Sequence, residues 1–173
     1  LAEAFLQGVI SEVLEECAED LEFCEGIITN KKFSSPFFDG SKVSLLQTLE
    51  QVVNTPFQRI TYTEAIDLLN KSSKKFEHPT NWGDALQTEH ERYLSEDLFK
   101  APTIVTDYPA SFKSFYMYLN DDGKTVRAMD VLVPRIGELI GGSQREDRLD
   151  VLKERIAHHD LDEKDYWWYL NLR

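Results

Sequence analysis

The sequence predicts an α+β fold, with helices packed against one face of an antiparallel sheet. Two observations carry this prediction. Residues 1–100 place apolar side chains mostly at three- and four-residue steps, the spacing of amphipathic helices, whereas residues 101–145 form the short alternating runs typical of antiparallel strands. With 173 residues, of which 42% are hydrophobic, the chain can bury a sizeable core within one domain.

The helical part begins with a spacing that predicts an amphipathic helix over residues 1–25, ended by Gly26. Residues 29–42 are rich in Ser, Pro, Gly and Lys, and we interpret them as a surface loop. Helical spacing returns over residues 42–54, and Pro56 ends that helix because the residue before a proline disfavours the α conformation.

A short strand is predicted over residues 57–62, where the side chains alternate and several are β-branched. Thr61 or Thr63 then caps a helix over residues 64–72. A further charged helix is predicted over residues 88–99.

After residue 100 the pattern changes to four strand candidates. The second and third are joined by the sequence NDDGK, a strong antiparallel hairpin turn. Two helices follow, the last of them rich in aromatic residues. The strands are predicted at 102–109, 113–119, 126–134 and 136–142, and the helices at 145–159 and 162–172.

The charge of the chain bears on its partners. It has 19 basic and 31 acidic residues, a net charge of −12, so the chain as a whole repels polyanions. Binding of nucleic acid would need a local basic patch or sequence outside this chain. No apolar run approaches the roughly 20 residues that span a bilayer, and the N-terminus is acidic where a signal peptide is basic. We expect a soluble protein with no membrane partner.

Several ionisable residues interrupt the predicted strands, although burying an unpaired charge costs several kcal/mol. Asp130 and Glu138, expected on neighbouring strands, would present two carboxylates to one pocket, which suits Mg²⁺ held together with phosphate oxygens. The alternative is that each carboxylate pairs with an arginine on a hydrated face of the sheet. Lys113 and Tyr116 lie in the same block of strands.

Two glycines and an arginine follow Glu138. Gly141 and Gly142 would allow a ligand to approach the backbone closely, although a Gly-Gly pair is also an ordinary bend. Arg145 offers a planar fork of donors for a carboxylate, a phosphate or an amide carbonyl, and its alternative is a surface ion pair. The four histidines form no metal set, and no Ser or Cys has the context of a catalytic nucleophile.

Four segments resemble the asparaginyl-tRNA synthetases of bacterial and organellar type, which are class II enzymes. The resemblance is almost continuous over residues 81–173 and looser before them. The segments are WGDALQTEHERYL, PTIVTDYPASFKSFYMYLNDDGKTV, AMDVLVPRIGELIGGSQREDRLDVL and DYWWYLNLR.

This resemblance implies a catalytic domain built on an antiparallel sheet with flanking helices, which activates asparagine with ATP and transfers it to tRNA(Asn). Asp130 and Glu138 would bind the Mg²⁺ that bridges the ATP phosphates, and Lys113 and Tyr116 would line the amino-acid pocket. Arg145 would reach the substrate side chain. Glu138 and Arg145 are thus the implied catalytic residues, with Gly141 and Gly142 as the floor under the substrate.

The family's motifs 1 and 2 would precede this chain, and motif 3 would follow it. Residues 1–173 are therefore expected to form the central part of an incomplete catalytic domain that is inactive alone. The resemblance implies a full-length homodimer in the cytoplasm, with mitochondria or plastids as alternatives. The competing hypothesis is a truncated relative that has lost catalysis and serves as a binding or regulatory module.

Two positions depart from the family pattern. Ala85 precedes Leu86 where Asp is usual, with Asp84 one place earlier, and Asn171 stands where Asp is usual. A further question concerns substrate choice, because Arg145 can donate to the amide oxygen of asparagine but would attract the full charge of aspartate more strongly. Discrimination therefore needs an acceptor for the amide NH₂, which the sequence does not identify.

Overall fold

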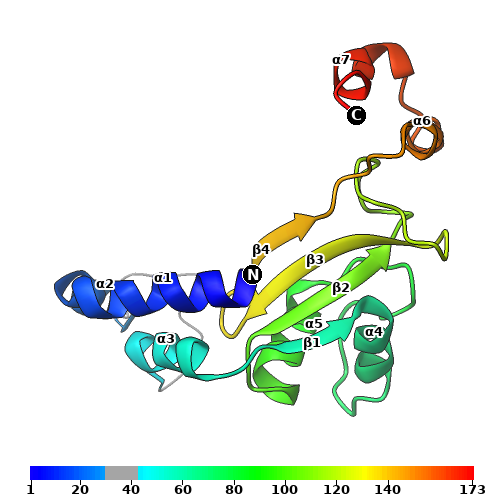
Figure 1. The fold of residues 1–173 in the computed structure, drawn as a ribbon. Helices are drawn as coiled ribbons and strands as arrows, with labels where there is room; N and C mark the ends of the chain where they lie inside the picture. Colours follow the sequence, from blue (N-terminus) through cyan, green and yellow to red (C-terminus); the bar gives the residue numbers. More distant parts are fainter. Residues whose placement is uncertain (30–42) are drawn as a thin grey trace. The chain divides into compact units, whose positions relative to one another are not determined.

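The computed structural model describes residues 1–29 and 43–173 (Figure 1). It confirms the α+β prediction, with a four-stranded sheet in the order β1-β2-β3-β4. The loop predicted over 29–42 lies, apart from Thr29, outside the described residues. The helices are α1 (Ala2–Glu16), α2 (Ala18–Thr29), α3 (Leu45–Asn54), α4 (Tyr62–Asn70), α5 (Thr88–Arg92), the π-helix η1 (Tyr93–Leu98), α6 (Leu149–His158), the 3₁₀-helix η2 (Glu163–Tyr166) and α7 (Trp167–Leu170); the strands are β1 (Gln58–Thr61), β2 (Thr103–Pro109), β3 (Thr125–Val133) and β4 (Gly137–Ser143).

The sheet is mixed rather than antiparallel throughout. In Figure 1 the arrows of β1 and β2 point the same way, whereas β3 runs against both of its neighbours. The backbone N–H of Gln58 donates to the carbonyl of Pro102 at 2.9 Å, where β1 meets the start of β2. The long helical connection from β1 to β2 permits this parallel pairing, which a tight turn could not make.

The chain forms two compact units, and the division runs across all four strands of the sheet, β1 to β4. Unit 1 comprises Leu1–Gln58, Thr88–Ile104 and Val131–Leu139, and unit 2 comprises Arg59–Gln87, Val105–Asp130 and Ile140–Arg173.

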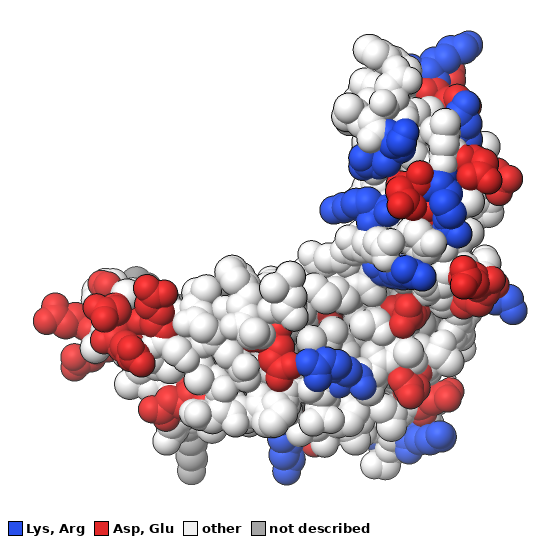
Figure 2. Space-filling model, in the orientation of Figure 1, with Lys and Arg blue, Asp and Glu red and all other residues white. Residues whose placement is uncertain are grey.

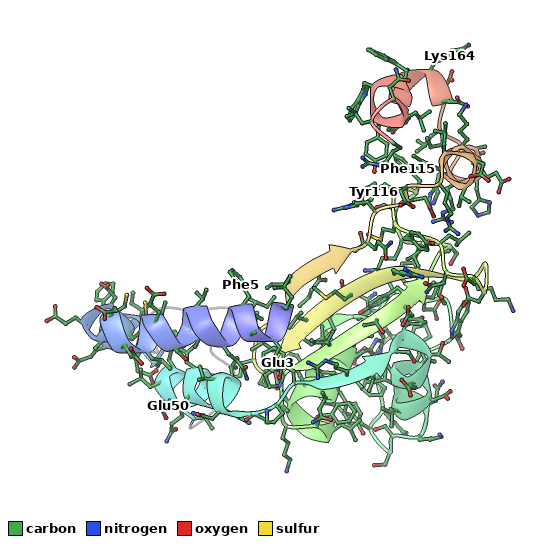
Figure 3. All side chains as sticks on the ribbon, viewed as in Figure 1. Glu3, Phe5, Glu50, Phe115, Tyr116 and Lys164 are labelled. Atoms are coloured by element: carbon green, nitrogen blue, oxygen red, sulfur yellow. The ribbon has the colours of Figure 1, made fainter. Side chains whose placement is uncertain are left out.

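In unit 1, helices α1 and α2 both pack against α3. The single helix predicted over residues 1–25 is wrong, because the chain breaks at Cys17, which has φ −117° and ψ 33°. Gly26 does not end α2, which continues to Thr29. Ser44 begins α3 with a capping box, and the Phe57 N–H donates to Glu3 Oε1 at 2.9 Å. Figure 3 labels Glu3 and the exposed Phe5 on opposite sides of α1.

Acidic residues gather over α1 and α2 of unit 1, as Figure 2 shows. Residues 1–29 contain eight acidic residues and no Lys, Arg or His. Unit 1 as a whole has 6 basic and 15 acidic residues, whereas unit 2 has 13 and 16. The net charges are therefore −9 for unit 1 and −3 for unit 2. Unit 1 is therefore expected to repel polyanions more strongly than unit 2.

In unit 2, α4 begins two residues before its predicted start. Thr61 is its N-cap, and the Thr61 hydroxyl and the Glu64 carboxylate form a capping box. Tyr62 is fully buried and its ring contacts Tyr108 at a centroid distance of 5.4 Å. The Tyr62 hydroxyl donates to the Asp84 carbonyl at 2.6 Å, so α4 holds the following loop.

The strand predicted over 113–119 is not formed. This stretch makes only the isolated bridges Met117 to Arg145 and Leu119 to Val126. The turn that follows it is present, since Gly123, at φ 65°, donates its N–H to the Asn120 carbonyl at 3.0 Å.

Two helix predictions also need correction. The helix predicted from residue 145 begins only at Leu149, because Glu146 and Arg148 bond to each other and to Leu119. The helix predicted over residues 88–99 begins at Thr88 but continues as a π-helix from Tyr93. Among the described residues, no helix is both long enough and apolar enough to cross a membrane.

Candidate functional site

Lys113 and Asp130 form a partly buried ion pair in unit 2. Asp130 projects from β3 and is only 6% exposed, and its Oδ2 accepts a hydrogen bond from Lys113 Nζ at 2.9 Å. The same ammonium lies 4.1 Å from the centroid of the Tyr108 ring. The charge of Asp130 is thus compensated by a lysine. The alternative interpretation placed an arginine beside this carboxylate on a hydrated face, whereas the observed partner is a lysine and the pair is partly buried.

Tyr116 and Arg145 form a second pair in unit 2. The Arg145 guanidinium carbon lies 4.5 Å from the centroid of the Tyr116 ring, and the bridge between Met117 and Arg145 fixes the backbone register. A hydrogen bond with Ser114 lowers the pKa of Tyr116, and one with Arg145 lowers it further. The positive charges of Arg145 and Lys113 act in the same direction. Lys113 and Arg145 therefore both act on one phenol.

Arg145 is exposed, and the described part of the chain supplies no ion-pair partner for it. Among the residues that the structure describes, no carboxylate forms an ion pair with it. The surface ion pair that was its alternative interpretation is absent from this part of the chain. A guanidinium held against a tyrosine but without an anion can donate to a ligand oxygen.

A cavity of about 350 Å³ in unit 2 contains both Tyr116 and Arg145. Figure 3 shows Tyr116 beside Phe115, and the rings of Phe115 and Tyr166 meet at a centroid distance of 5.0 Å. No carboxylate lines this cavity. Its lining residues are Phe115, Tyr116, Arg145, Tyr166, Trp168, Tyr169 and Arg173.

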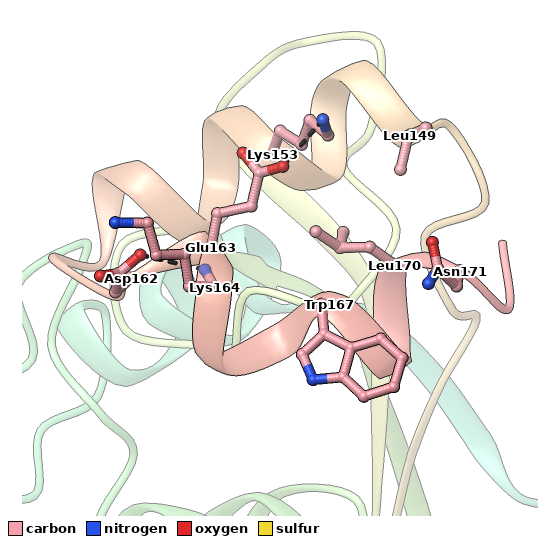
Figure 4. Close-up of a pocket in the computed structure, with 8 residues that line it drawn as sticks. All are labelled: Leu149, Lys153, Asp162, Glu163, Lys164, Trp167, Leu170 and Asn171. Carbon is pink, nitrogen blue, oxygen red and sulfur yellow. Dashed lines mark hydrogen bonds and ion pairs between the residues drawn. The ribbon is translucent and has the colours of Figure 1, made fainter.

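A second cavity of about 480 Å³ lies among the C-terminal helices of unit 2 (Figure 4). Lys153 Nζ and Glu163 Oε1 pair there at 2.8 Å, so the charges of this cavity are largely compensated.

The two departures from the family pattern lie in different places. Asn171 lines this second cavity and is the C-cap of α7. At the other departure, Asp84 Oδ2 accepts from the Asn81 side chain at 3.1 Å and so fixes a loop.

The predicted glycines lie in β4. A side chain at Gly142 would place its Cβ 3.3 Å from Met129 Cε, tighter than most such contacts. Close packing against Met129 is thus a reason for a glycine at position 142 that does not involve a ligand. Gly141 is exposed.

Glu138 also lies on β4 and is exposed, but it belongs to unit 1. The other predicted site residues belong to unit 2. Carboxylates are the ligands that Mg²⁺ prefers; that of Glu138 is open to solvent, whereas Asp130 is buried and its Oδ2 accepts from Lys113. No group of three or more His, Cys, Asp or Glu residues that could hold a metal occurs in the described ranges.

Three charged residues support this site but were not identified from the sequence: Glu146, Arg148 and Arg155. Glu146 is the most buried of them. Its carboxylate is fully buried and accepts from the Leu119 N–H at 3.0 Å and from Arg148 Nε and Nη2 at 2.8 Å each. Burial raises the pKa of Glu146, but the hydrogen bonds from Arg148 and Leu119 outweigh it and bring the pKa to about 2.

Arg148 and Arg155 are the other two. Arg148 Nη2 donates to the Leu119 carbonyl at 2.6 Å, and its guanidinium carbon lies 4.1 Å from the Tyr118 ring centroid. Arg155 is buried in α6. The only local signal for Glu146 and Arg148 was the dense run REDR, which we had interpreted as the first turn of a helix.

Comparison with known proteins places the whole chain in one family. Residues 1–173 match the model of the class II tRNA synthetases (D, K and N). The asparagine–tRNA ligase of Nostoc sp. is 56% identical over 173 residues, which cover all of this chain and 35% of the relative. That of Clostridium perfringens is 54% identical, with 34% of it covered.

Solved structures agree with these relatives. The asparaginyl-tRNA synthetase of Pyrococcus horikoshii is similar with a TM-score of 0.76 and 35% identity, over 99% of this chain and 36% of that one. The same enzyme complexed with asparaginyl-adenylate gives the same TM-score and identity, with 34% of its chain covered. The chain thus spans about a third of the length of the proteins it matches.

Proposed function

This chain belongs to the class II tRNA synthetases of the D, K and N group, and we propose that it is the central part of the catalytic domain of an asparagine–tRNA ligase. The similarity to asparagine–tRNA ligases over all 173 residues supports this choice within the group. The homodimer and the cytoplasmic location that the resemblance implies belong to the same proposal.

The observation that carries the proposal is the arrangement around Tyr116. Three residues that the resemblance assigns to the amino-acid pocket, Lys113, Tyr116 and Arg145, interact within unit 2 although they come from two distant segments. Among them, Arg145 has no ion-pair partner in the described part of the chain. The cavity that contains Arg145 is lined mostly by aromatic side chains, and no carboxylate side chain is among its lining residues. Arg145 can therefore donate to the side-chain oxygen of a bound amino acid.

The proposed reaction has two steps. The carboxylate of asparagine attacks the α-phosphorus of ATP, and pyrophosphate leaves with the electrons of the broken P–O bond. A ribose hydroxyl at the 3′ end of tRNA(Asn) then attacks the carbonyl carbon of the adenylate, and AMP leaves. Catalysis of such steps is largely positioning and neutralisation of phosphate charge.

The residues of this chain contribute mainly to the first step. Arg145 donates to the amide oxygen and so orients asparagine, while Lys113 and Tyr116 line the pocket. Mg²⁺, when bound with ATP, would neutralise phosphate charge, and Glu138 and Asp130 are the carboxylates that would hold it. Gly141 and Gly142 would lie beneath the substrate. Because Arg145 attracts aspartate as well, the acceptor for the amide NH₂ must be a further group of the site.

A chimaera tests this proposal. We expect residues 1–173, placed in the Nostoc asparagine–tRNA ligase instead of the matching 35%, to support ATP–pyrophosphate exchange with asparagine in preference to aspartate. The isolated 173-residue chain is expected to give no exchange, because the resemblance places motifs 2 and 3 outside it.

Two outcomes would count against the proposal. A chimaera that melts as cooperatively as the parent Nostoc enzyme but uses aspartate would place the chain with another member of the group. A folded chimaera without any exchange would favour the non-catalytic module. Exchange by the isolated chain would show that its site is more complete than we propose.

A further inference from the structure

The segment that carries Lys113 and Tyr116 has no regular secondary structure to fix it. Residues 110–119, here called the Lys113 segment, form turns and isolated bridges only. A site that must hold a substrate within a fraction of an ångström needs its supporting residues fixed in place. Backbone hydrogen bonds hold the second half of the segment, since the Tyr118 N–H donates to the Gln144 carbonyl at 3.0 Å and the Tyr116 carbonyl accepts from the Glu146 N–H at 2.9 Å. The residues around Lys113 therefore depend most on side chains for support.

Arg155 supplies that support at the start of the segment. Its Nη2 donates to the Ala110 carbonyl at 2.8 Å and to the Lys113 carbonyl at 3.2 Å. One guanidinium thus binds two backbone carbonyls that are three residues apart. Because the Lys113 ammonium bonds to Asp130, Lys113 is held at both its backbone and its side chain.

Arg155 is held in this place at an energetic cost. It is only 6% exposed, and its Nε has no hydrogen-bond partner in the structure. Burial lowers the pKa of Arg155, and the negative charge of Glu146 opposes that effect. Burying a charged group costs free energy unless it is hydrogen-bonded, and the two hydrogen bonds that offset this cost for Arg155 both go to the Lys113 segment.

Docking of α6 does not depend on Arg155. Leu152 and Ile156 of the same helix are at most 1% exposed and form an apolar cluster with Leu170. Phe115 and Tyr166 pack against this cluster. These apolar contacts hold the helix in unit 2. The bonds of Arg155 therefore serve the Lys113 segment more than they serve the helix.

We infer that Arg155 is a positioning residue for asparagine binding, which acts by fixing the backbone of the Lys113 segment. It touches neither the substrate pocket nor Arg145 in the described contacts. Lysine is expected to reproduce only part of the effect, because its strongly hydrated ammonium lies on a flexible stem, whereas the planar guanidinium is less hydrated and holds its N–H groups in fixed directions. The inference rests on the proposed function for its substrate.

The kinetic test uses the chimaera. We expect Arg155→Met to raise KM for asparagine about tenfold or more, because small displacements of substrate-positioning groups have large effects, while KM for ATP stays within about twofold. Arg155→Lys should give an intermediate KM for asparagine. Lys153→Met, on the same helix but exposed and paired with Glu163, is the matched control and should change neither KM.

A second test needs no activity. In the isolated 173-residue chain, hydrogen exchange of peptides covering the Lys113 segment should be faster in Arg155→Met than in Lys153→Met, at a temperature well below unfolding. If the methionine variant does not fold, Arg155→Lys takes its place in both tests.

Several results would overturn the inference. One is an unchanged KM for asparagine, and another is an equal rise in both KM values, which would indicate general loosening of the fold. Unchanged exchange of the Lys113 segment would do so as well. Failure of the unmodified chimaera to use asparagine would instead refute the proposed function, and the exchange experiment would still decide whether Arg155 fixes the segment.

Discussion

Arg145→Ala in the chimaera is expected to lower kcat/KM for asparagine about 10- to 150-fold. A charge-assisted hydrogen bond to the substrate contributes roughly 1.5–3 kcal/mol, and its loss leaves the amide oxygen without a donor. The effect should be largest in KM for asparagine if Arg145 binds the ground state, and it should appear in kcat as well if the bond orients the carboxylate for attack. Pyrophosphate exchange over a range of asparagine concentrations gives both constants.

Arg127→Ala is the matched control for that change. Arg127 is also exposed and stacks on a tyrosine, with 4.2 Å from its guanidinium carbon to the Tyr118 ring centroid. It lines a different cavity from Arg145. Its removal should change kcat/KM by no more than about twofold. If Arg145→Ala behaved like this control, Arg145 would not read the substrate.

Glu146→Gln should lower the free energy of unfolding of the 173-residue chain by roughly 1.5–3 kcal/mol at pH 7, because the buried Glu146 side chain loses its charge-assisted hydrogen bonds with the partly exposed Arg148 guanidinium. The amide also cannot accept from the Leu119 N–H and both Arg148 nitrogens as a carboxylate does. Urea unfolding followed by tryptophan fluorescence measures the change. The control is Glu163→Gln, whose exposed pair with Lys153 should contribute less than about 1 kcal/mol.

The contribution of Glu146 should depend on pH. Its pKa is about 2 in the folded chain and about 4.5 ordinarily, so folding favours the carboxylate. The stabilisation is therefore complete above the ordinary pKa and is lost as the pH falls towards 2. The difference between the unmodified chain and Glu146→Gln should stay constant down to about pH 5 and then shrink as the pH falls from about 5 towards 2. A difference that also stays constant below about pH 5 would contradict the role of the buried carboxylate.

The sequence predicted the order of most elements because their signals are local. Ser44 and Thr61 begin α3 and α4 with capping boxes, which involve residues only three apart. The break at Cys17 had no such signal, since no Pro or Gly marks it. Local patterns therefore predicted that these helices are present, but they did not show the interruption at Cys17.

The failure at 113–119 has a different cause. Its aromatic residues fit a strand, but its backbone makes only isolated bridges, and some of its backbone groups bond to charged side chains far along the chain. Leu119 bonds to Glu146, 27 residues away, and Lys113 bonds to Arg155, 42 residues away. A pattern confined to neighbouring residues cannot show such partners.

The candidate site was predictable in part. The resemblance singled out Lys113, Tyr116 and Arg145, which the structure brings into electrostatic contact. The pairing of Lys113 with Asp130 could not be predicted, because it depends on the path of an irregular segment. Magnesium binding by Asp130 and Glu138 stays a prediction.

The most direct test of the site is a crystal structure of the chimaera with a non-hydrolysable analogue of asparaginyl-adenylate. The account predicts an Arg145 guanidinium nitrogen at about 3 Å from the side-chain amide oxygen, with Lys113 and Tyr116 lining the same pocket. An analogue bound with its amide away from Arg145, or in a pocket that contains neither Lys113 nor Tyr116, would contradict it.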